Sequence, residues 1–503
     1  MDGHRTLRSW LHATSILILV LLSTRAAGAS PPGGAPRSTR AVLVGCRPWA
    51  LAQTAVVVDP GDSRGDRDEG GPIPDLPRPD YLRPVRYPGS DATIERISGD
   101  TGEPIASIHG TWGADARHHY AKTQPWNSDG TLLVIENRKG SPSHLLLDGD
   151  SYEPRGALCD QAWDFRWHPS PEHPHEIIDV NREGTELRWI DVTDCRENRS
   201  WRLPVKVDGF GGGEGNPSLD GRFVALGNDH GVFVVDMDPP HGHGRIGPVY
   251  EFPPCSLVAG RPNDCAVDNL SISPSGRYVV VKYGEGKGVT VVDSTEDATR
   301  VYEVDPATLE LRPHEMAASS PRCGSFAARP DGWTFPLKHS DLARNPFDEG
   351  EDVLIGGRSC PGSKLAHTLM VRLRDGRVTE LTDPSGEAPF YHTSCQALDR
   401  PGWVYVDYFK AEGRRYSDEI LAVKMDGSRT IEHVCHTHTQ AKGCYRCEAH
   451  PVPSRDGRRV LFASNWMEDC DRGCGPATDI KDYVVRGWAS RDSDRDDRRG
   501  KGH

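Results

Sequence analysis

One segment near the C-terminus holds the densest group of side chains that could bind a metal ion. Seven potential ligands lie within eighteen residues: His433, Cys435, His436, His438, Cys444, Cys447 and His450. Thiolate and imidazole groups suit zinc, which usually takes four tetrahedral nitrogen or sulfur ligands. The spacing Cys444-x-x-Cys447-x-x-His450 is compatible with such a site, although it matches no standard zinc finger. The alternative is a disulfide between Cys435 and Cys444, with the histidines at the surface.

Four other clusters carry groups suited to acid–base chemistry or to binding an anion. They are centred on His119 and Tyr120, on Arg222, on His339 and on His392. Histidine transfers protons near neutral pH, and tyrosine can act as an acid. An arginine in a turn can hold a carboxylate with its planar guanidinium group. Each cluster is also explained, on its own, by hydrogen-bonded structural residues or by a solvent-exposed turn.

The composition indicates a turn-rich β protein. The 503 residues include 53 glycines and 40 prolines, and the formal charge is -13. This negative charge argues against a nucleic-acid partner. An acidic polymer would need a local basic patch.

The N-terminus predicts export from the cytoplasm. Residues 1–29 read as a signal peptide, with arginines at the start, an apolar run at 16–22 and an Ala-x-Ala cleavage site at 27–29. The run is too short to span a membrane, so we expect a secreted or periplasmic protein without a membrane span. A retained anchor, or a lipoprotein cleavage box ending at Cys46, is the alternative.

Export favours disulfide formation among the thirteen cysteines. Because the number is odd, at least one cysteine is free, lipidated or bound to metal. Cys255 with Cys265 and Cys470 with Cys474 are candidate local disulfides. The full pairing cannot be read from the spacing.

A repeated turn-and-strand pattern predicts the architecture. Seven turns each precede a short β-branched run: 131–135, 176–180, 223–226, 278–282, 352–355, 403–407 and 459–463. Most of these runs start 45 to 56 residues apart, with one longer gap. Such a period, with several strands in each unit, is typical of a β-propeller and of neither a β-sandwich nor a β-helix.

We therefore predict an all-β fold with a single seven-bladed β-propeller over residues 92–488, six or eight blades being the alternatives. Residues 30–91 read as a low-complexity, disordered leader and 489–503 as a disordered charged tail. Residues 91–97 and 482–486 are expected to pair in one blade, which would close the ring and leave no exposed sheet edge.

Three segments resemble the propeller polysaccharide lyases, within the TolB-type and WD40-like propellers. They are Gln124-Pro-Trp-Asn-Ser-Asp-Gly130, Glu448-Ala-His-Pro-Val-Pro-Ser454 and Val460-Leu-Phe-Ala-Ser-Asn-Trp466. They are similar to segments of the oligogalacturonate lyases and ulvan lyases, and the resemblance covers about residues 92–488.

The resemblance also bears on the metal. In oligogalacturonate lyases a Gln-x-x-His-Pro-His motif supplies ligands. Here His450 matches the first histidine, Cys447 replaces the glutamine and Val452 replaces the second histidine. This departure favours a structural zinc site over one for manganese or calcium. The expected ligands are His392, His436, Cys447 and His450.

The activity implied by the resemblance is β-elimination on a uronic-acid polysaccharide. That reaction needs a group that neutralises the uronate carboxylate, a base for the C5 proton and an acid for the leaving oxygen. The candidate catalytic residues are His119, Tyr120, His144, Arg222 and His339. His119 is the base or acid, Tyr120 or His144 is its partner, and Arg222 is the neutralising group.

Two other functions remain open at this point. A non-catalytic exported propeller that binds protein or glycan is the main alternative. A hydrolase is the third, although neither Gly-x-Ser-x-Gly nor His-Glu-x-x-His occurs. We expect the chain to be a monomer whose partner is an anionic polysaccharide.

Overall fold

The computed structural model describes ten stretches of the chain and four two-residue strands between residues 319 and 333. The stretches are 73–238, 244–252, 265–285, 298–314, 337–359, 366–383, 387–411, 413–441, 444–467 and 479–488. The expected signal peptide, the leader up to residue 72 and the charged tail lie outside them, as do Cys255, Cys470 and Cys474. Within these stretches, no helix is long and apolar enough to cross a membrane.

Small antiparallel sheets, called blades below, account for most of the described residues. Blade one contains β3 (Asp115–Arg117), β4 (Leu132–Arg138), β5 (His144–Asp148) and β6 (Pro154–Ala157). Blade two contains β7 (Asp164–Trp167), β8 (Glu176–Val180), β9 (Glu186–Asp191) and β10 (Arg196–Arg202). Blade three contains β11 (Phe223–Asn228), β12 (Gly231–Asp236), β13 (Arg245–Ile246) and β14 (Tyr250–Glu251).

The second half of the chain continues the pattern. Blade four contains β15 (Cys265–Ile272), β16 (Tyr278–Glu285), β17 (Ala298–Val304) and β18 (Leu311–Pro313). Blade five contains β23 (Lys338–Asn345), β24 (Glu351–Ser359), β25 (Ala366–Arg372) and β26 (Val378–Glu380). Blade six contains β27 (Phe390–Ser394), β28 (Trp403–Tyr408), β29 (Glu419–Lys424) and β30 (Ile431–His436).

Blade seven combines the two ends of the described chain. It contains β31 (Val452–Pro453), β32 (Arg459–Ser464), β33 (Ile480–Arg486), β2 (Thr93–Arg96) and β1 (Val85–Arg86). A short 3₁₀ helix, η1 (Tyr445–Cys447), precedes it. The longer gap in the repeat also holds two strand pairs between blades four and five: β19 (Ser319–Ser320) with β20 (Gly324–Ser325), and β21 (Ala328–Arg329) with β22 (Gly332–Trp333).

The repeated turns have a local cause, which the turn before β32 illustrates. The Ser454 hydroxyl donates to Asp456 and accepts the backbone N–H of Arg459, at 3.1 Å. Gly457 adopts φ +65°, a conformation that costs little only for glycine. The Ser-x-Asp-Gly sequence therefore closes the turn by itself, and the β-branched run that follows starts the strand.

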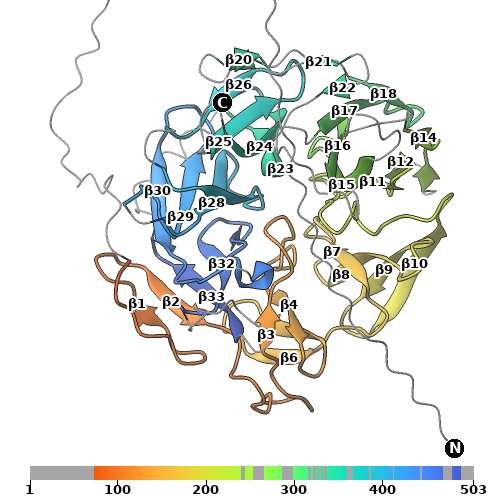
Figure 1. Ribbon diagram of the computed structural model, residues 1–503. Helices are drawn as coiled ribbons and strands as arrows, with labels where there is room; N and C mark the ends of the chain where they lie inside the picture. Colours follow the sequence, from red (N-terminus) through yellow and green to blue (C-terminus); the bar gives the residue numbers. More distant parts are fainter. Residues whose placement is uncertain are drawn as a thin grey trace, which may run out of the picture. The chain divides into compact units, whose positions relative to one another are not determined.

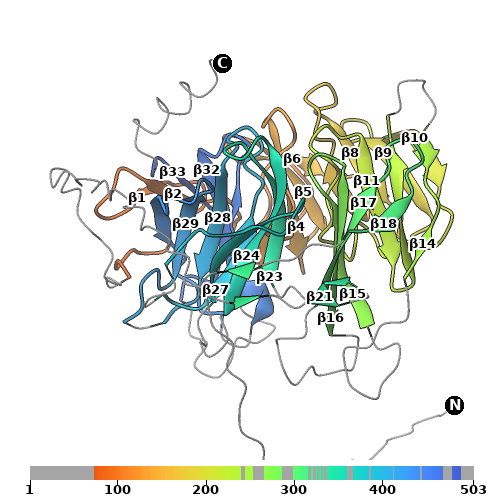
Figure 2. The same cartoon turned by 90° about the horizontal axis from the view of Figure 1, so that it is seen from above.

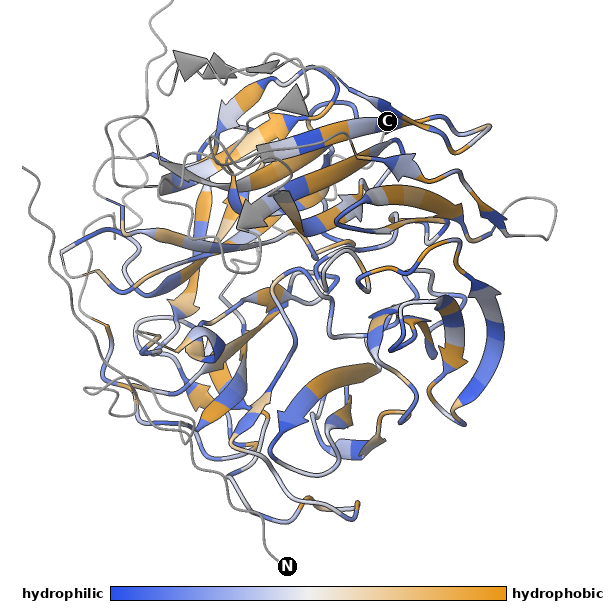
Figure 3. Cartoon of the chain, turned by 45° about the vertical axis from the view of Figure 1, so that its right-hand side comes forward, coloured by the Kyte–Doolittle hydropathy of each residue, from blue (hydrophilic) through white to orange (hydrophobic). Residues whose placement is uncertain are grey.

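Neighbouring blades are held together by buried apolar side chains. Between blades one and two, Val134 packs in one cluster with Trp167, and between blades seven and one, Leu461 does so with Leu133. Across the described residues, seven such clusters link the blades in chain order and return to the first. Figures 1 and 2 show the resulting ring of blades, and Figure 3 shows apolar residues concentrated on their strands. The predicted seven-bladed propeller is confirmed.

The ring closes where the sequence predicts. β2 pairs antiparallel with β33, with Ile94 opposite Val485 and Arg96 opposite Tyr483. β3 of blade one also pairs with β33, in parallel, at Asp115 and Ile480. Strands from the two ends of the propeller therefore share one sheet, so that neither end leaves an open sheet edge at this junction.

Ile94 provides a test of this closure. Its side chain is fully buried in the cluster of blade seven. We expect Ile94→Ala to lower the free energy of unfolding by about 2–5 kcal/mol and Ile94→Val by about 0.5–1.5 kcal/mol, because each leaves a cavity. The measurement is urea unfolding followed by circular dichroism. Thr93→Ala, on the opposite face of β2, is the control, and an unchanged midpoint for Ile94→Ala would contradict closure by this strand.

Candidate functional site

A buried group of metal-ligand type lies on the inner strands of blades six and seven. His392 comes from β27, and Glu448 and His450 from the segment between η1 and β31. One ligand atom from each of the three residues lies within 4.8 Å of the others. The Nε2 atoms of His392 and His450 are each 3.5 Å from Oε2 of Glu448. We call these three residues the His–Glu–His cluster.

The chemistry of the His–Glu–His cluster fits a divalent transition metal. Both ring nitrogens of His392 and His450, and Oε2 of Glu448, are buried without a hydrogen-bond partner among the described residues. Such atoms are costly to bury unless something coordinates them. Burial lowers the pKa of both histidines well below its usual value, so that the imidazoles are neutral, as metal ligands must be. Asp407 Oδ1 lies 3.4 Å from His392 Nδ1, a position from which a carboxylate orients a metal-bound imidazole.

His339 and Tyr120 lie beside the cluster. The His339 ring is 4.7 Å from that of His392, and the Tyr120 ring is 4.9 Å from that of His450, measured between centroids. The Tyr120 hydroxyl lies 3.2 Å from Nδ1 of His339. Burial raises the pKa of Tyr120 well above its usual value and lowers that of His339 well below its own. Two of the predicted catalytic residues are thus placed with the metal-binding group.

Irregular backbone aims these histidines inward. The pairing register shifts between Lys338 and Asp341 in β23, and between Phe390 and Thr393 in β27. Bulges of this kind re-aim a side chain and occur often next to active sites. His339 and His450 also adopt φ +46° and +45°, which non-glycine residues rarely do. Strain of this kind is found at functional sites, where the surroundings hold it in place.

Two of the expected metal ligands lie elsewhere. Cys447 forms a disulfide with Cys444 across η1, where the Cα atoms are 5.3 Å apart, so that its sulfur is not available as a ligand. This pairing also replaces the disulfide proposed between Cys435 and Cys444, and Cys435 is a buried free thiol. His436 lies on β30, the outer strand of blade six, where its ring hydrogen-bonds the hydroxyl of Tyr87.

Glu448 is the member of the His–Glu–His cluster that the sequence prediction missed. Cys447 lies in η1, whereas Glu448 follows η1 in extended backbone, so the two neighbouring side chains leave the chain in different directions. The available signal in the sequence was a carboxylate two residues before His450. The Cys-x-x-Cys spacing drew attention to the wrong donor.

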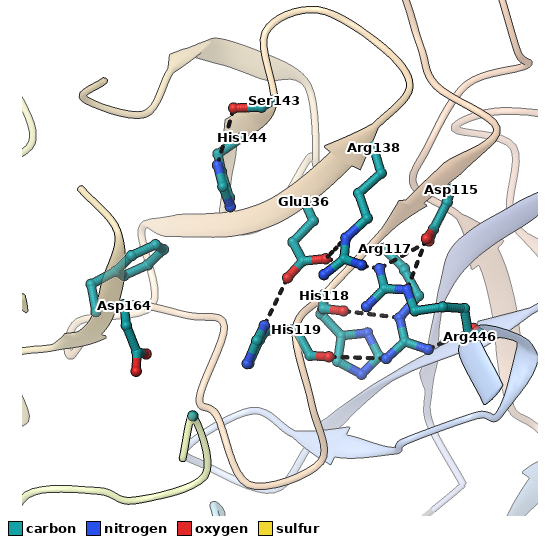
Figure 4. A network of polar contacts seen from close by, with 12 residues as sticks. Asp115, Arg117, His118, His119, Glu136, Arg138, Ser143, His144, Asp164 and Arg446 are labelled. Carbon is teal, nitrogen blue, oxygen red and sulfur yellow. Dashed lines mark hydrogen bonds and ion pairs between the residues drawn. The ribbon is translucent and has the colours of Figure 1, made fainter. Parts of the chain in front are cut away.

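A separate open groove lies next to blade one. Its volume is about 950 Å³, and His119, Glu136 and His144 are among the residues that line it. His119 is 44% exposed, and its Nδ1–H donates to Oε1 of Glu136 at 2.7 Å. The other ring nitrogen, Nε2, is left without a partner among the described residues and is free to act as a base. Figure 4 shows Glu136 between His119 and Arg138. Asp164 lies apart from these contacts, at the left of the view.

Glu136 is held as a carboxylate. Burial acts to raise its pKa, but the hydrogen bond from His119 and the charges of His119, Arg446 and Arg138 hold it well below its usual value. Arg138 Nε and a terminal nitrogen of Arg446 lie 2.7 and 2.8 Å from Oε2. An ionised carboxylate at Nδ1 fixes the tautomer and orientation of the His119 ring, as the aspartate does in a Ser-His-Asp triad.

Arg222 is not part of this groove. Its guanidinium group makes two hydrogen bonds to Asp236, of 2.9 and 3.0 Å, and Arg222 does not line the cavity. The reason is the turn before β11, which directs Arg222 toward a fully buried aspartate in need of a counter-ion. His144 does line the groove, where its Nδ1 lies 3.3 Å from Ser143 Oγ and burial lowers its pKa.

Residues 117–120, at the end of β3, contact both the groove and the His–Glu–His cluster. Arg117 is buried and donates to the backbone carbonyls of His118 and His119 on its own segment, and of Arg446 and Glu448 on the other. The ring nitrogens of His118 lie 2.8 Å from Asp482 Oδ1 and 2.7 Å from the carbonyl oxygen of His450. His119 therefore points to the groove while its neighbours on both sides contact the metal-ligand segment.

The comparisons with known proteins identify no family for this chain. No protein-family model matches the chain, and no curated protein matches it either. The Cps50 (Swd1) β-propeller domain of Myceliophteria thermophila is 11% identical with a TM-score of 0.38, over 75% of this chain and 98% of its own. The Pan2 WD40 domain of Neurospora crassa is 12% identical with a TM-score of 0.40, over 73% and 89%. A TolB-type protein of Agrobacterium tumefaciens is 16% identical with a TM-score of 0.30, over 58% and 95%.

The His–Glu–His cluster predicts a stoichiometric metal site. We expect the purified chain to bind one zinc ion in this cluster, and His450→Ala or Glu448→Gln to weaken binding about 100-fold or more, since even residues that only orient a ligand contribute 10- to 100-fold. Isothermal titration calorimetry with zinc measures this. His436→Ala is the matched control, because that histidine lies on the outer strand, and loss of zinc binding in that variant alone would contradict the assignment.

Zinc binding should also depend on pH through Glu448. Burial raises the pKa of this carboxyl to about 8, although Arg117 acts to lower it. Below that pH a metal ion must displace the proton, so we expect affinity to fall about tenfold for each pH unit below about 8. The two histidines are already neutral and add no such dependence there. Titrations between about pH 6 and 8 test this, and a flat profile for the wild type would refute it.

Proposed function

We propose that the protein is an exported polysaccharide lyase that cleaves a uronic-acid polymer by β-elimination. The observation that carries the proposal is the His119–Glu136 pair at an open groove of about 950 Å³, with Arg138 and His144 beside it. A half-exposed imidazole with an ionised carboxylate on its far nitrogen is a general base with a defined direction.

The reaction sets three requirements, and groups in the groove match them. His119 Nε2 faces the groove and is positioned to take the C5 proton. The Arg138 side chain is 53% exposed, and only its Nε is engaged by Glu136, so its remaining N–H groups can neutralise the uronate carboxylate. The proton accepted by His119 can return to the leaving oxygen, so that the proton balance closes on one residue.

Two of the proposed catalytic groups differ from those predicted from the sequence. Tyr120 lies against the His–Glu–His cluster and not in the groove, so we do not propose it as the acid. Arg138 replaces Arg222 as the neutralising group, because Arg222 is paired with Asp236. His144 remains a groove residue that can hydrogen-bond the sugar.

The proposed metal is a structural zinc ion held by His392, Glu448 and His450. A divalent ion there would supply the positive charge that the buried carboxylate requires. It would also fix the segment of Arg446 and Glu448, whose carbonyl groups accept hydrogen bonds from Arg117. Two described disulfides, Cys159–Cys195 and Cys444–Cys447, are in keeping with an exported protein. We propose an anionic polysaccharide as the partner and a monomer as the working form.

The second candidate is an exported propeller that binds glycan without cleaving it. The pairing of Arg222 with Asp236 favours it, because it removes the arginine that the sequence pointed to. Propellers host many unrelated functions, so the fold does not separate the two.

Turnover separates these candidates. Purified protein is incubated with pectic, ulvan, alginate and glycosaminoglycan polymers, and the C4–C5 unsaturated product is followed by ultraviolet absorbance. We expect His119→Ala to lower kcat about 10²–10⁴-fold, the usual contribution of a general base, and Glu136→Gln to lower it less. His230→Ala, an exposed histidine outside the groove, is the matched control. Absence of the unsaturated product from every polymer would refute the lyase and leave the binding protein.

A further inference from the structure

The groove carries an aromatic side chain that the proposed reaction does not use. Trp163 is 55% exposed and lines the groove. A single exposed apolar residue is ordinary, so its exposure alone indicates nothing. Its support is more specific: the backbone N–H of Trp163 donates to the buried Asp179 at 2.7 Å, and Arg188 in turn pairs with Asp179. The indole is therefore presented to the groove from a fixed backbone.

Two cations share the groove with this indole. The Arg182 guanidinium lies over the Trp163 ring, 4.8 Å from its centroid, and Lys206 lines the same groove. Both are exposed, and neither has a carboxylate within ion-pair distance among the described residues. In contrast, the groove carboxylates Asp164 and Asp268 pair with cations at 2.9 Å.

The lining carries further charges besides these two cations. Asp208 and Asp229 line the groove without a cationic partner among the described residues, and Asp208 lies two residues after Lys206 on the connection between β10 and β11. Glu136 is already satisfied by His119, Arg138 and Arg446. The cation that an anionic group meets at the indole itself is Arg182.

Trp163 shares a segment with a residue that contacts the groove histidine His144. Trp163 immediately precedes β7, and residues two apart in an extended segment point to the same side. The residue two positions on is Phe165, whose ring contacts that of His144 with centroids 6.2 Å apart. Trp163 and His144 therefore line one groove from neighbouring blades.

We infer that Trp163, Arg182 and Lys206 form a subsite for an acidic pyranose unit in the groove that also holds the His119–Glu136 pair. The open face of the indole stacks on the sugar ring, and the guanidinium and ammonium groups pair with its carboxylate or sulfate. The inference rests on the proposed function, because it places the next unit of the same polymer. It adds a ligand class and three residues that the elimination itself does not require.

Binding to an inactive variant tests the subsite separately from catalysis. In a His119→Ala background, affinity for polygalacturonate and for dextran sulfate is measured by calorimetry, with dextran as the neutral probe. We expect Trp163→Ala to weaken binding of an acidic polymer about tenfold and Trp163→Phe to weaken it less. Arg182→Ala should weaken binding by a similar factor, and Arg182→Lys should restore part of it. The polymer that binds more tightly shows whether carboxylate or sulfate is the preferred group.

Controls and kinetics complete the test. Phe347→Ala removes another exposed aromatic ring that does not line the groove and should leave affinity unchanged. In the active protein, Trp163→Ala should raise KM about tenfold with kcat within about twofold, as expected for a group that binds substrate and transition state equally. Circular dichroism checks that each variant folds.

The possible failures are distinguishable. Binding that depends on Trp163, without unsaturated product from any polymer, would refute the lyase and keep the subsite. Unsaturated product with a wild-type KM for Trp163→Ala would refute the subsite and keep the lyase. Absence of binding by every acidic polymer, or equal binding of dextran, would overturn the subsite.

Discussion

The pairing of β2 with β33 is the constraint on which the rest of the structure depends. It joins strands from opposite ends of the propeller, and β3 follows directly in blade one. As a result, His118 and His450, 332 residues apart in the chain, come within hydrogen-bond distance. The groove histidine His119 and the segment that carries Glu448 and His450 both lie at this junction.

Burial then decides how the polar groups near this junction behave. Imidazoles removed from water are neutral, and the pKa of a carboxyl such as Glu448 rises, because charge is costly in a medium of low polarity. Arg117 remains charged there because four backbone carbonyls accept its hydrogen bonds. His119, two residues along the chain, faces open solvent in the groove. A single strand end thus serves a buried site suited to metal binding and an open site suited to acid–base chemistry.

Much of the fold could be predicted because its causes are local. Short turns rich in Ser, Asp, Gly and Pro, followed by β-branched runs, predict strands through short-range hydrogen bonds and backbone preference, and all seven runs coincide with strands. Their period predicts blades, and the two end segments predict closure. His392 and His450 were among the four ligands expected from the resemblance to the propeller lyases, and the structure brings these two together.

The errors concern which side chains meet. Cys447 and Glu448 are neighbours in sequence, yet Cys447 lies in η1 and is bonded to Cys444, whereas Glu448 follows η1 in extended backbone and faces the histidines. Arg222 is held by Asp236, a partner fourteen residues away on the next strand. The sequence by itself determined the all-β repeat, the place of ring closure and the residue types available for chemistry. Only the tertiary structure decided which of them share a site, since that depends on strand facing, bulges and burial between distant segments.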